Sequence, residues 1–445
     1  MAKENCLGIR QRSTDCSFHH TLGIVCAATH LNNDATRILY VSSCWPHDRA
    51  FGGQLRALQI GRALKKLGRV TLAVVSSDAA IPELIKKAEA EFEVEPPIQV
   101  SVRPNRGLNQ RLQWAFDPHF LNIYGCVADA TDRERLLGRL GAFDLIWVLN
   151  SRTPNILNQW HWARSVLDID DVPSTFQRTV WQNGAEWKEK LKAGVRMQLL
   201  KRREHLWKER FSVLSVCSDA DRQYLGGGHH VHVIPNGCER QPSEPVRNPA
   251  DPPRIGFIGL YSYAPNLEGT RWFVRSCWPL IKQQIPEARL RVVGQDSDGP
   301  LKPNAPDVDA LGYVADAASE IATWSAMIIP VRQGAGTRVK IADGFSRKCP
   351  IVSTHLGAFG YDVRSGRELL LADRPDDFAA ACVSLIRDRT AASAMADRAY
   401  AAFLQNWTWD AIAPRVWAAA EDALRLGSGV AAQRAQRGHR TKATP

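Results

Sequence analysis

Two cations and two glycines stand close together in the second half of the chain. Gly334 and Gly336 let the backbone approach a ligand closely, because glycine has no side chain. Thr337 is expected to cap the helix that follows, and the N–H groups at a helix start attract anions, phosphate above all. Arg338 and Lys340 lie one turn from that end, where they oppose the helix dipole. A diphosphate would neutralise both cations.

These residues need a strand before them and a helix after them, and the sequence predicts both. Residues 326–330 form a short apolar run that is typical of a buried parallel strand. The helix that begins near Thr337 brings Asp343 one turn further, where a carboxylate can accept hydrogen bonds from ribose hydroxyls. From spacing alone, an ordinary strand–turn–helix unit with solvated basic residues explains the pattern equally well.

The order of residues over 330–360 resembles the donor-site signature of group 1 glycosyltransferases. It reads G-x-G-T-R-x-K-I-x-(acidic)-(small), followed by Pro-Ile-Val-Ser-Thr and Gly-x-x-Gly. The stretch 231–237 resembles the Val-Ile-Pro-Asn-Gly motif that closes the first half of these enzymes. The resemblance extends over 37–426 and implies the α/β GT-B fold, in which two Rossmann-like domains with parallel sheets face each other across a cleft and a C-terminal helix crosses back to the first domain. It also implies a retaining transferase that uses a nucleotide-diphosphate sugar and no metal cofactor.

The resemblance also implies roles for individual residues. Arg338 and Lys340 would be the catalytic groups that stabilise the leaving diphosphate. The turn 312–314 would contact the base through backbone groups, and the turn 263–266 would lie near the phosphates. The donor-binding residues implied in this way are Gly334, Gly336, Thr337, Asp343, Gly312, Tyr313, Val314 and Asn266.

Two positions depart from the family pattern. Many members carry two glutamates eight residues apart, whereas this chain has Ala335 and Asp343 there. Aspartate reaches less far than glutamate, and Gly344 after it weakens a helix by about 1 kcal/mol. Both changes bear on ribose binding and on activity.

The first half of the chain begins with a strand–helix–strand pattern. Residues 37–43 read as a strand, a Gly-Gly turn follows, and a helix from Leu55 to near Gly68 leads to a strand at 70–75. A similar turn faces the cleft in group 1 glycosyltransferases, where it meets the transferred sugar or its acceptor. The cleft residues that this implies are Gly52 and Gly53, with His47 as the nearest candidate for the family's first-domain histidine.

Asp170 and Asp171 follow a second buried strand, at 166–169. Acidic residues at the carboxyl end of a parallel strand point into the cleft, where open α/β sheets bind ligands. There they would orient acceptor hydroxyls or stabilise positive charge on a sugar ring. Capping of the next helix is the alternative interpretation.

Residues 185–211 read as one long helix rich in lysine and arginine, interleaved with Leu199, Leu200, Leu206 and Trp207. A basic amphipathic helix of this kind predicts peripheral contact with an anionic membrane. Ordinary domain surface is the alternative, with Glu204 and Glu209 as local partners for the cations.

Length and composition set the limits for these interpretations. A chain of 445 residues with 44% hydrophobic and 23% charged residues is expected to form two globular domains. The formal net charge of +11 favours an acidic partner such as a nucleotide diphosphate or an anionic membrane, and a nucleic-acid role would depend on this charge alone. The ten cysteines are scattered and form no zinc motif, which is typical of reduced thiols in a cytoplasmic protein.

No apolar run approaches the ~20 residues that cross a bilayer. Residues 21–28 resemble a very short signal-peptide core, but Glu4 and Asp15 precede them, so we do not expect secretion. The expected organisation is a poorly ordered extension at 1–35, an acceptor domain at 36–240, a linker at 241–253, a nucleotide-sugar domain at 254–405, a crossing helix at 406–426 and a disordered basic tail at 427–445.

The sequence therefore predicts a glycosyltransferase that moves a sugar from a nucleotide-diphosphate donor to a polysaccharide, lipid-linked or small-molecule acceptor. Two alternatives remain. A catalytically weak or inactive nucleotide-sugar-binding protein would fit Ala335, Asp343 and Gly344. A nucleotide-sugar epimerase has a similar two-domain shape, but its catalytic acids and histidine have no convincing counterpart here.

Overall fold

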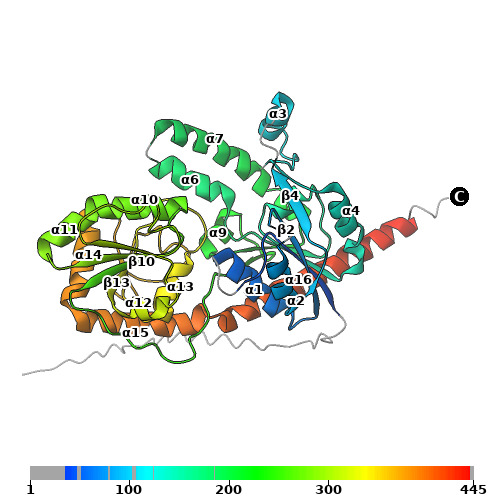
Figure 1. Cartoon of the computed structure of the whole chain (residues 1–445). Helices are drawn as coiled ribbons and strands as arrows, with labels where there is room; N and C mark the ends of the chain where they lie inside the picture. Colours follow the sequence, from blue (N-terminus) through cyan, green and yellow to red (C-terminus); the bar gives the residue numbers. More distant parts are fainter. Residues whose placement is uncertain are drawn as a thin grey trace, which may run out of the picture.

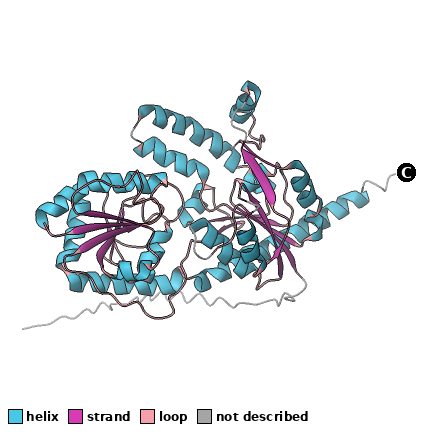
Figure 2. Ribbon diagram, in the orientation of Figure 1, coloured by secondary structure: helices cyan, strands magenta, loops and turns pink. Residues whose placement is uncertain are grey.

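The computed structural model describes residues 36–47, 52–78, 81–102, 107–123, 125–184 and 186–440, and its side chains up to residue 426. Two α/β domains lie side by side, each with helices on both faces of a sheet (Figures 1 and 2). The expected extension at 1–35 lies outside the described residues. The predicted fold class, two Rossmann-like domains with a C-terminal helix that returns to the first, is confirmed.

The sheet of the first domain is parallel except at one edge. Among the described residues its order is β5-β4-β2-β1-β6-β7-β8-β9, β3 pairs with β2, and only the β4–β5 pair is antiparallel. Its strands are β1 (Arg37–Ser42), β2 (Arg69–Ser76), β3 (Glu93–Val94), β4 (Ile98–Val102), β5 (Cys126–Ala128), β6 (Leu145–Leu149), β7 (Ser165–Asp168), β8 (Val213–Val216) and β9 (Val231–Val233).

The sheet of the second domain is parallel throughout its described strands, in the order β12-β11-β10-β13-β14-β15. This is the doubly wound order, whose direction of winding reverses between β10 and β13, and such sheets bind ligands beyond the carboxyl ends of the strands at that reversal. The strands are β10 (Arg254–Ile258), β11 (Arg289–Val293), β12 (Val308–Gly312), β13 (Trp324–Ile329), β14 (Ile351–Ser353) and β15 (Leu370–Leu371).

Helices connect the strands in both domains. In the first they are α1 (Gly52–Leu64), α2 (Pro82–Glu89), α3 (Leu108–Phe116), α4 (Ala130–Gly138), a 3-10 turn (Leu140–Ala142), α5 (Thr153–Ile156), α6 (Pro173–Asn183), α7 (Trp187–Glu204), α8 (Trp207–Arg210) and α9 (Asp219–Tyr224). In the second they are α10 (Ala264–Trp272), a π-helical segment (Phe273–Cys277), α11 (Trp278–Gln284), α12 (Ala317–Ala322), α13 (Val339–Ser346), α14 (Pro375–Arg387) and α15 (Arg389–Asn406).

The last helix, α16 (Trp409–Arg440), crosses back from the second domain to the first (Figure 1). Trp407 packs in the second domain, with its ring centroid 5.1 Å from that of Tyr361, whereas Trp409 and Ile412 belong to the core of the first. Gly237 makes the join possible, because a Cβ there would lie 2.8 Å from the carbonyl oxygen of Trp407. The two tryptophans therefore anchor the crossing on different domains.

Two local predictions are wrong. The 185–211 segment is two helices, α7 and α8, because the chain turns at His205 and Leu206. Gly52 and Gly53 form the first turn of α1 rather than a separate turn before it. The basic tail expected to be disordered at 427–445 stays a prediction: the backbone of α16 extends to Arg440, and 441–445 lie outside the described residues.

Candidate active site

The loop between β13 and α13 has a backbone shape that requires its two glycines. Gly334 and Gly336 both have positive φ, +138° and +67°, in a region that residues with a side chain rarely adopt. Space is also lacking: a Cβ at Gly334 would lie 2.3 Å from Arg338 Nη2, and one at Gly336 would lie 1.6 Å from Asp171 Oδ1. The loop therefore closes around Arg338 on one side and touches the first domain on the other.

Arg338 is the N-cap residue of α13, and its side chain folds back over the loop. Its Nη1 donates to the carbonyl oxygens of Ala335 and of Gly336, the latter at 3.0 Å. Its Nε and Nη2 are buried and have no hydrogen-bond partner among the residues that the structure describes, and the same holds for the hydroxyl of Thr337. No side-chain cap is present, so the prediction that Thr337 caps the helix is wrong. Three donor atoms at this helix start thus lack an acceptor.

Lys340 brings a second cation to the same place. Its ammonium lies 5.4 Å from the centroid of the Phe257 ring and packs against Gly259, where a Cβ would lie 2.6 Å from Nζ. Burial, with the charge of Arg338 beside it, lowers the pKa of Lys340 to about 8. Desolvating a cation beside another cation is costly unless an anion compensates. The site is therefore suited to bind negative charge.

The start of α1 meets the start of α13 across the boundary between the domains. A Cβ at Gly52 would lie 3.1 Å from Val339 Cγ2, whereas Gly53 has open space around it. Two helix N-termini, both with positive partial charge, thus converge near Arg338 and Lys340. The structure brings Gly52, a predicted cleft residue, next to the first residue of α13.

Asp170 and Asp171 also reach this boundary, but in different environments. Asp170 has φ of +60°, and its Oδ1 accepts hydrogen bonds from Asn236 Nδ2 (3.0 Å) and Cys217 Sγ (3.1 Å). Asp171 keeps part of its surface exposed, but protein atoms of both domains surround its carboxyl group. This partial loss of water contact, together with the carboxylate of Asp170, raises the pKa of Asp171 to about 8. Asp171 is thus a carboxyl group of the first domain that reaches the glycine loop.

Tyr263 is the first residue of the turn 263–266, and no role of its own is predicted for it from the sequence. It precedes α10 as the N-cap residue and is partly exposed. Burial raises the pKa of its phenol, the charge of Asp171 raises it further, and the charge of Arg338 lowers it. An aromatic residue just before a Pro-containing helix start, after a predicted strand, was the available signal.

The turn after β12 lies at the same carboxyl edge of the second sheet. Gly312 has φ of +65°, and its N–H donates to Ser297 Oγ at 2.9 Å. Tyr313 is 74% exposed, whereas Val314 is partly buried against the core of the second domain. Asn266 instead is buried and donates from Nδ2 to the carbonyl oxygen of Leu260 at 2.7 Å. It therefore shapes the turn after β10 rather than presenting its amide to a ligand.

Two predicted residues have other partners. Asp343 pairs with Arg347 Nε at 2.9 Å, on the side of α13 where Cys238 lies, so its Oδ1 is already engaged. His47 does not reach the glycine loop: its Nε2 lies 2.9 Å from Lys87 Nζ, in a separate cavity of about 220 Å³. The chain after β1 turns towards α2, and this takes His47 away from α13.

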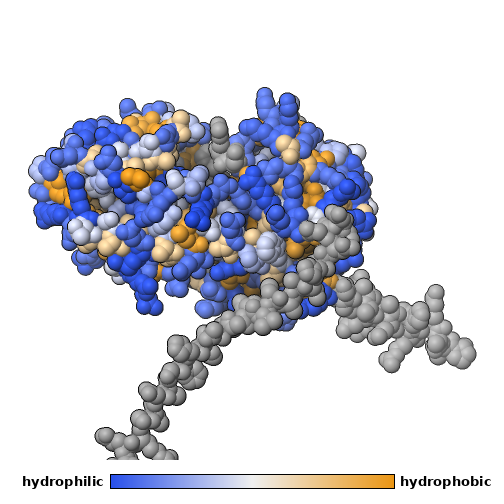
Figure 3. Space-filling model, turned by 90° about the horizontal axis from the view of Figure 1, so that it is seen from below, coloured by the Kyte–Doolittle hydropathy of each residue, from blue (hydrophilic) through white to orange (hydrophobic). Residues whose placement is uncertain are grey.

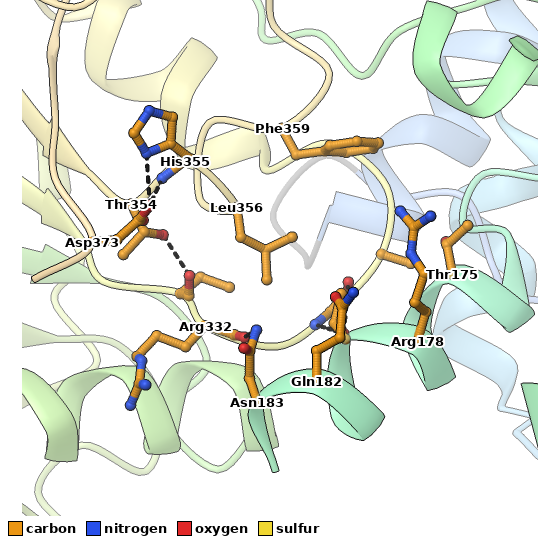
Figure 4. A pocket seen from close by; sticks show the side chains of 14 residues that line it. Thr175, Arg178, Gln182, Asn183, Arg332, Thr354, His355, Leu356, Phe359 and Asp373 are labelled. Carbon is orange, nitrogen blue, oxygen red and sulfur yellow. Dashed lines mark hydrogen bonds and ion pairs between the residues drawn. The ribbon is translucent and has the colours of Figure 1, made fainter. Parts of the chain in front are cut away.

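A cavity of about 450 Å³ lies between the domains, beside the glycine loop. Figure 4 shows Arg178 and Gln182 rising from α6 towards it, with Leu356 and Phe359 on the opposite side. Helix α6 also holds the loop, because Thr179 Oγ1 accepts a hydrogen bond from the N–H of Gly334 at 2.9 Å. The volume is within the ~300–1,000 Å³ of small-molecule sites.

Comparison with known sequences identifies the second domain. Residues 252–388, which include the glycine loop and α13, match the family described as "Glycosyl transferases group 1". A protein of Klebsiella pneumoniae described as "Uncharacterized 44.6 kDa protein in cps region" is 23% identical over 161 residues, which are 34% of this chain and 42% of that protein. The chain thus spans less than half the length of this curated relative.

Comparison with solved structures covers both domains. Sucrose-phosphate synthase from Thermosynechococcus elongatus superposes with a TM-score of 0.60 at 16% identity, over 90% of this chain and 100% of that one. Anabaena HepE, solved in complex with UDP and glucose, gives 0.54 at 15% identity, over 86% and 98%. At such identities the likeness shows the shared fold. Residues 252–388 therefore match the group 1 glycosyltransferase family, and the chain as a whole has the GT-B fold of these structures.

Proposed function

We propose that this protein transfers a sugar from a nucleotide-diphosphate donor to a polysaccharide, lipid-linked or small-molecule acceptor. The observation that carries the proposal is the pair of cations at the start of α13, neither of which forms an ion pair with a described residue. Among the described residues, two buried N–H donor atoms of Arg338 have no acceptor, and Lys340 is held against Phe257 and Gly259 beside it. A diphosphate supplies both the charge and the acceptor atoms that this place lacks.

Charge on the leaving diphosphate grows as the bond to the sugar breaks. Groups already fixed around that charge lower the barrier most, because they need no rearrangement during the reaction. Arg338 is held by the carbonyl oxygens of its own loop, and Lys340 is fixed by packing. Both cations are thus preorganised to stabilise the leaving group.

The nucleoside would extend from the diphosphate towards the turn after β12. There the exposed ring of Tyr313 offers a stacking face for a base, and the backbone of Gly312 and Val314 offers polar groups. Ribose recognition by Asp343 would require its carboxylate to bind the sugar while it is paired with Arg347. HepE, with its bound UDP, supports a uridine nucleotide as the first donor to test.

The acceptor would occupy the 450 Å³ cavity on the other side of Gly334 and Ala335. Its apolar wall suits the face of a sugar ring, and the side chains of Arg178 and Gln182 suit hydroxyl groups. Asp171 lies at the glycine loop, where an acceptor hydroxyl must approach the donor. In this proposal its carboxylate orients that hydroxyl and accepts its proton. The family resemblance favours retention of the anomeric configuration.

The test replaces Arg338 by glutamine and measures donor binding and turnover separately. Turnover of nucleotide-diphosphate sugars, with and without glycan acceptors, is followed by mass spectrometry, and binding by thermal shift. Arg338→Gln is expected to lower turnover by about a hundred- to a thousand-fold, or about 3–4 kcal/mol in the barrier. The matched control is Arg364→Gln, an exposed arginine of the same domain, which should change neither.

Other outcomes would contradict the proposal. Tight binding of a nucleotide sugar by the native chain, without transfer or hydrolysis of any donor, would favour a binding protein instead. Interconversion of free donors would favour an epimerase. Equal turnover of native chain and Arg338→Gln would remove Arg338 from the chemistry.

A further inference from the structure

Exposed apolar side chains gather on one side of the first domain. Among the described residues, seven of the thirteen exposed large apolar side chains lie on α3, α6 or α7, and these seven are between 47% and 76% exposed. They are Leu108, Leu112, Phe116, Trp181, Trp187, Leu191 and Val195. Figure 1 shows α3 and α7 on the same side, at the top of the view, and Figure 3 shows the opposite, mainly hydrophilic face. Such clustering marks an interaction surface.

The spacing of these residues gives each helix an apolar face that is exposed to solvent. On α7, Trp187, Leu191 and Val195 follow one another at four-residue intervals, which puts them on one face of the helix. Trp181 of α6 joins them, because its ring lies 3.4 Å from the position that a Cβ on Gly194 would take.

Helix α3 repeats the pattern. Leu108, Leu112 and Phe116 are also four residues apart, and no residue of α3 is buried. The two helices are tied together by Arg203 of α7, whose Nη2 donates to the carbonyl oxygen of Asp117 at 2.7 Å and to that of Trp114 at 2.6 Å. The apolar residues that the sequence suggested for membrane contact are not the exposed ones, since Trp207 is buried and Leu199 and Leu200 are partly so.

A row of cations runs beside the apolar face of α7. Lys188, Lys192 and Arg196 stand one position after each apolar residue and are exposed. Among the described residues no carboxylate pairs with these three, and the ammonium of Lys188 lies 5.8 Å from the centroid of the Trp187 ring. Apolar side chains next to unpaired cations match a lipid surface, where acyl chains lie beneath anionic headgroups.

We infer that α3 and the α6–α7 hairpin dock this protein on an anionic lipid bilayer, with Trp187 and Leu191 inserted below the headgroups. A second copy of the chain fits less well, because a symmetric contact would place the cations of α7 against their own copies. The inference does not depend on the proposed transfer activity, since none of the seven apolar side chains lines the cavity between the domains.

The test measures binding of the full-length chain to sedimented vesicles. Vesicles of phosphatidylcholine alone are compared with vesicles that also contain phosphatidylglycerol. We expect binding to the mixed vesicles only, weakened by added salt. The triple variant Lys188→Gln/Lys192→Gln/Arg196→Gln should weaken partitioning about a hundredfold, and Trp187→Ala/Leu191→Ala about tenfold or more. Leu112→Ala/Phe116→Ala tests α3 in the same way.

Matched controls separate this surface from general charge and hydrophobicity. Val246→Ala removes an exposed apolar side chain in the segment between β9 and β10, and Lys302→Gln/Arg374→Gln/Arg389→Gln removes three exposed cations of the second domain. Neither should change partitioning, and the melting temperature of every variant should match the native chain. Equal binding to both vesicle types, or native binding by Trp187→Ala/Leu191→Ala, would overturn the inference. So would a dimer in lipid-free solution that this variant abolishes, which would assign the face to a second copy.

Discussion

Asp168 and Asp171 stand three residues apart at the carboxyl end of the same strand, yet their surroundings differ completely. Asp168 is fully buried and accepts two hydrogen bonds from Arg56, at 2.7 Å from Nη2 and 3.1 Å from Nε, and one from Ser215. Asp171 lies in the crevice against Gly336. The first carboxylate holds the domain together, and the second is available to a ligand.

The difference arises from what the rest of the chain brings to each position. Arg56 comes from α1, and it also donates to Asn236 Oδ1 at 3.0 Å and to the carbonyl oxygen of Ile234 at 3.1 Å. It thus ties β7 to the end of the 231–237 motif, from which Asn236 reaches on to Asp170. The Val-Ile-Pro-Asn-Gly motif therefore holds Asp170, next to the crevice, in place, and in this proposal it takes no direct part in the chemistry.

The largest effect is expected when the buried pair is broken. Arg56→Ala leaves the carboxylate of Asp168 buried without its cation, and removing one partner of such a pair typically costs about 3–5 kcal/mol. Thermal and urea unfolding of the two proteins measures the loss. The matched control is Arg62→Ala on the same helix, whose partner Glu91 is partly exposed, so the loss should stay below about 1 kcal/mol. If both variants lost the same free energy of unfolding, burial of the Arg56–Asp168 pair would not account for its contribution to stability.

The available carboxylate should affect rate rather than folding. Asp171→Asn keeps the shape of the side chain but removes its capacity to accept a proton, which typically lowers the rate about a hundredfold or more. In the native enzyme the rate should rise with pH until about 8, as Asp171 loses its proton. Transfer rates measured across this range should be flat for Asp171→Asn. A rise that persists in the variant would assign the titration to another group.

Stability should depend on the same proton in the opposite sense. The pKa of Asp171 is raised in the folded chain, so between about pH 4 and about pH 8 the folded state holds a proton that the unfolded state releases. The free energy of unfolding therefore falls as pH rises through this window. Asp171→Asn should remove that part of the fall, which urea unfolding at several pH values would show.

The sequence predicted the second domain better than the first, for physical reasons. Around α13 the residues that do chemistry follow one another along a strand, a loop and a helix, so local patterns place Gly334, Gly336, Arg338 and Lys340 together. In the first domain the decisive contacts join distant segments, as Arg56 joins Asp168 112 residues away. No local pattern distinguishes Asp168 from Asp171.

The misplaced residues show the same limit. The position of His47 after the first strand suggests a histidine in the cleft, but its side chain lies against Lys87 of α2, 40 residues away in the sequence. Asp343 lies where the family places its acid, yet the shorter side chain pairs with Arg347 one turn along its own helix. The sequence does not predict the exposed apolar face of α7. Basic residues lie on all sides of this helix, so the charge pattern does not distinguish buried from exposed apolar residues.

A smaller effect should separate Lys340 from ordinary lysines. Its pKa of about 8 means that above this pH the free enzyme has largely lost the proton, and a bound diphosphate would restore the ammonium form. Nucleotide-diphosphate binding at about pH 9 should therefore take up a proton. Calorimetry in two buffers of different ionisation enthalpy measures this uptake. Lys340→Met should abolish it and the exposed Lys86→Met should not, whereas uptake by both variants would point to a different group.

The smallest effect concerns the helix start itself. A threonine that caps a helix contributes about 1 kcal/mol, but the buried hydroxyl of Thr337 has no partner among the described residues and does not cap α13. Thr337→Val should therefore leave the free energy of unfolding within about 0.5 kcal/mol of native or raise it slightly, because a desolvated hydroxyl is removed. Asp388, whose carboxylate accepts the N–H of Ala391 at 2.8 Å, is the matched control, and Asp388→Ala should lose about 1 kcal/mol. If Thr337→Val lowered the free energy of unfolding as much as Asp388→Ala does, Thr337 would cap α13 as the sequence predicts. Its hydroxyl would then not be available to donate to a diphosphate.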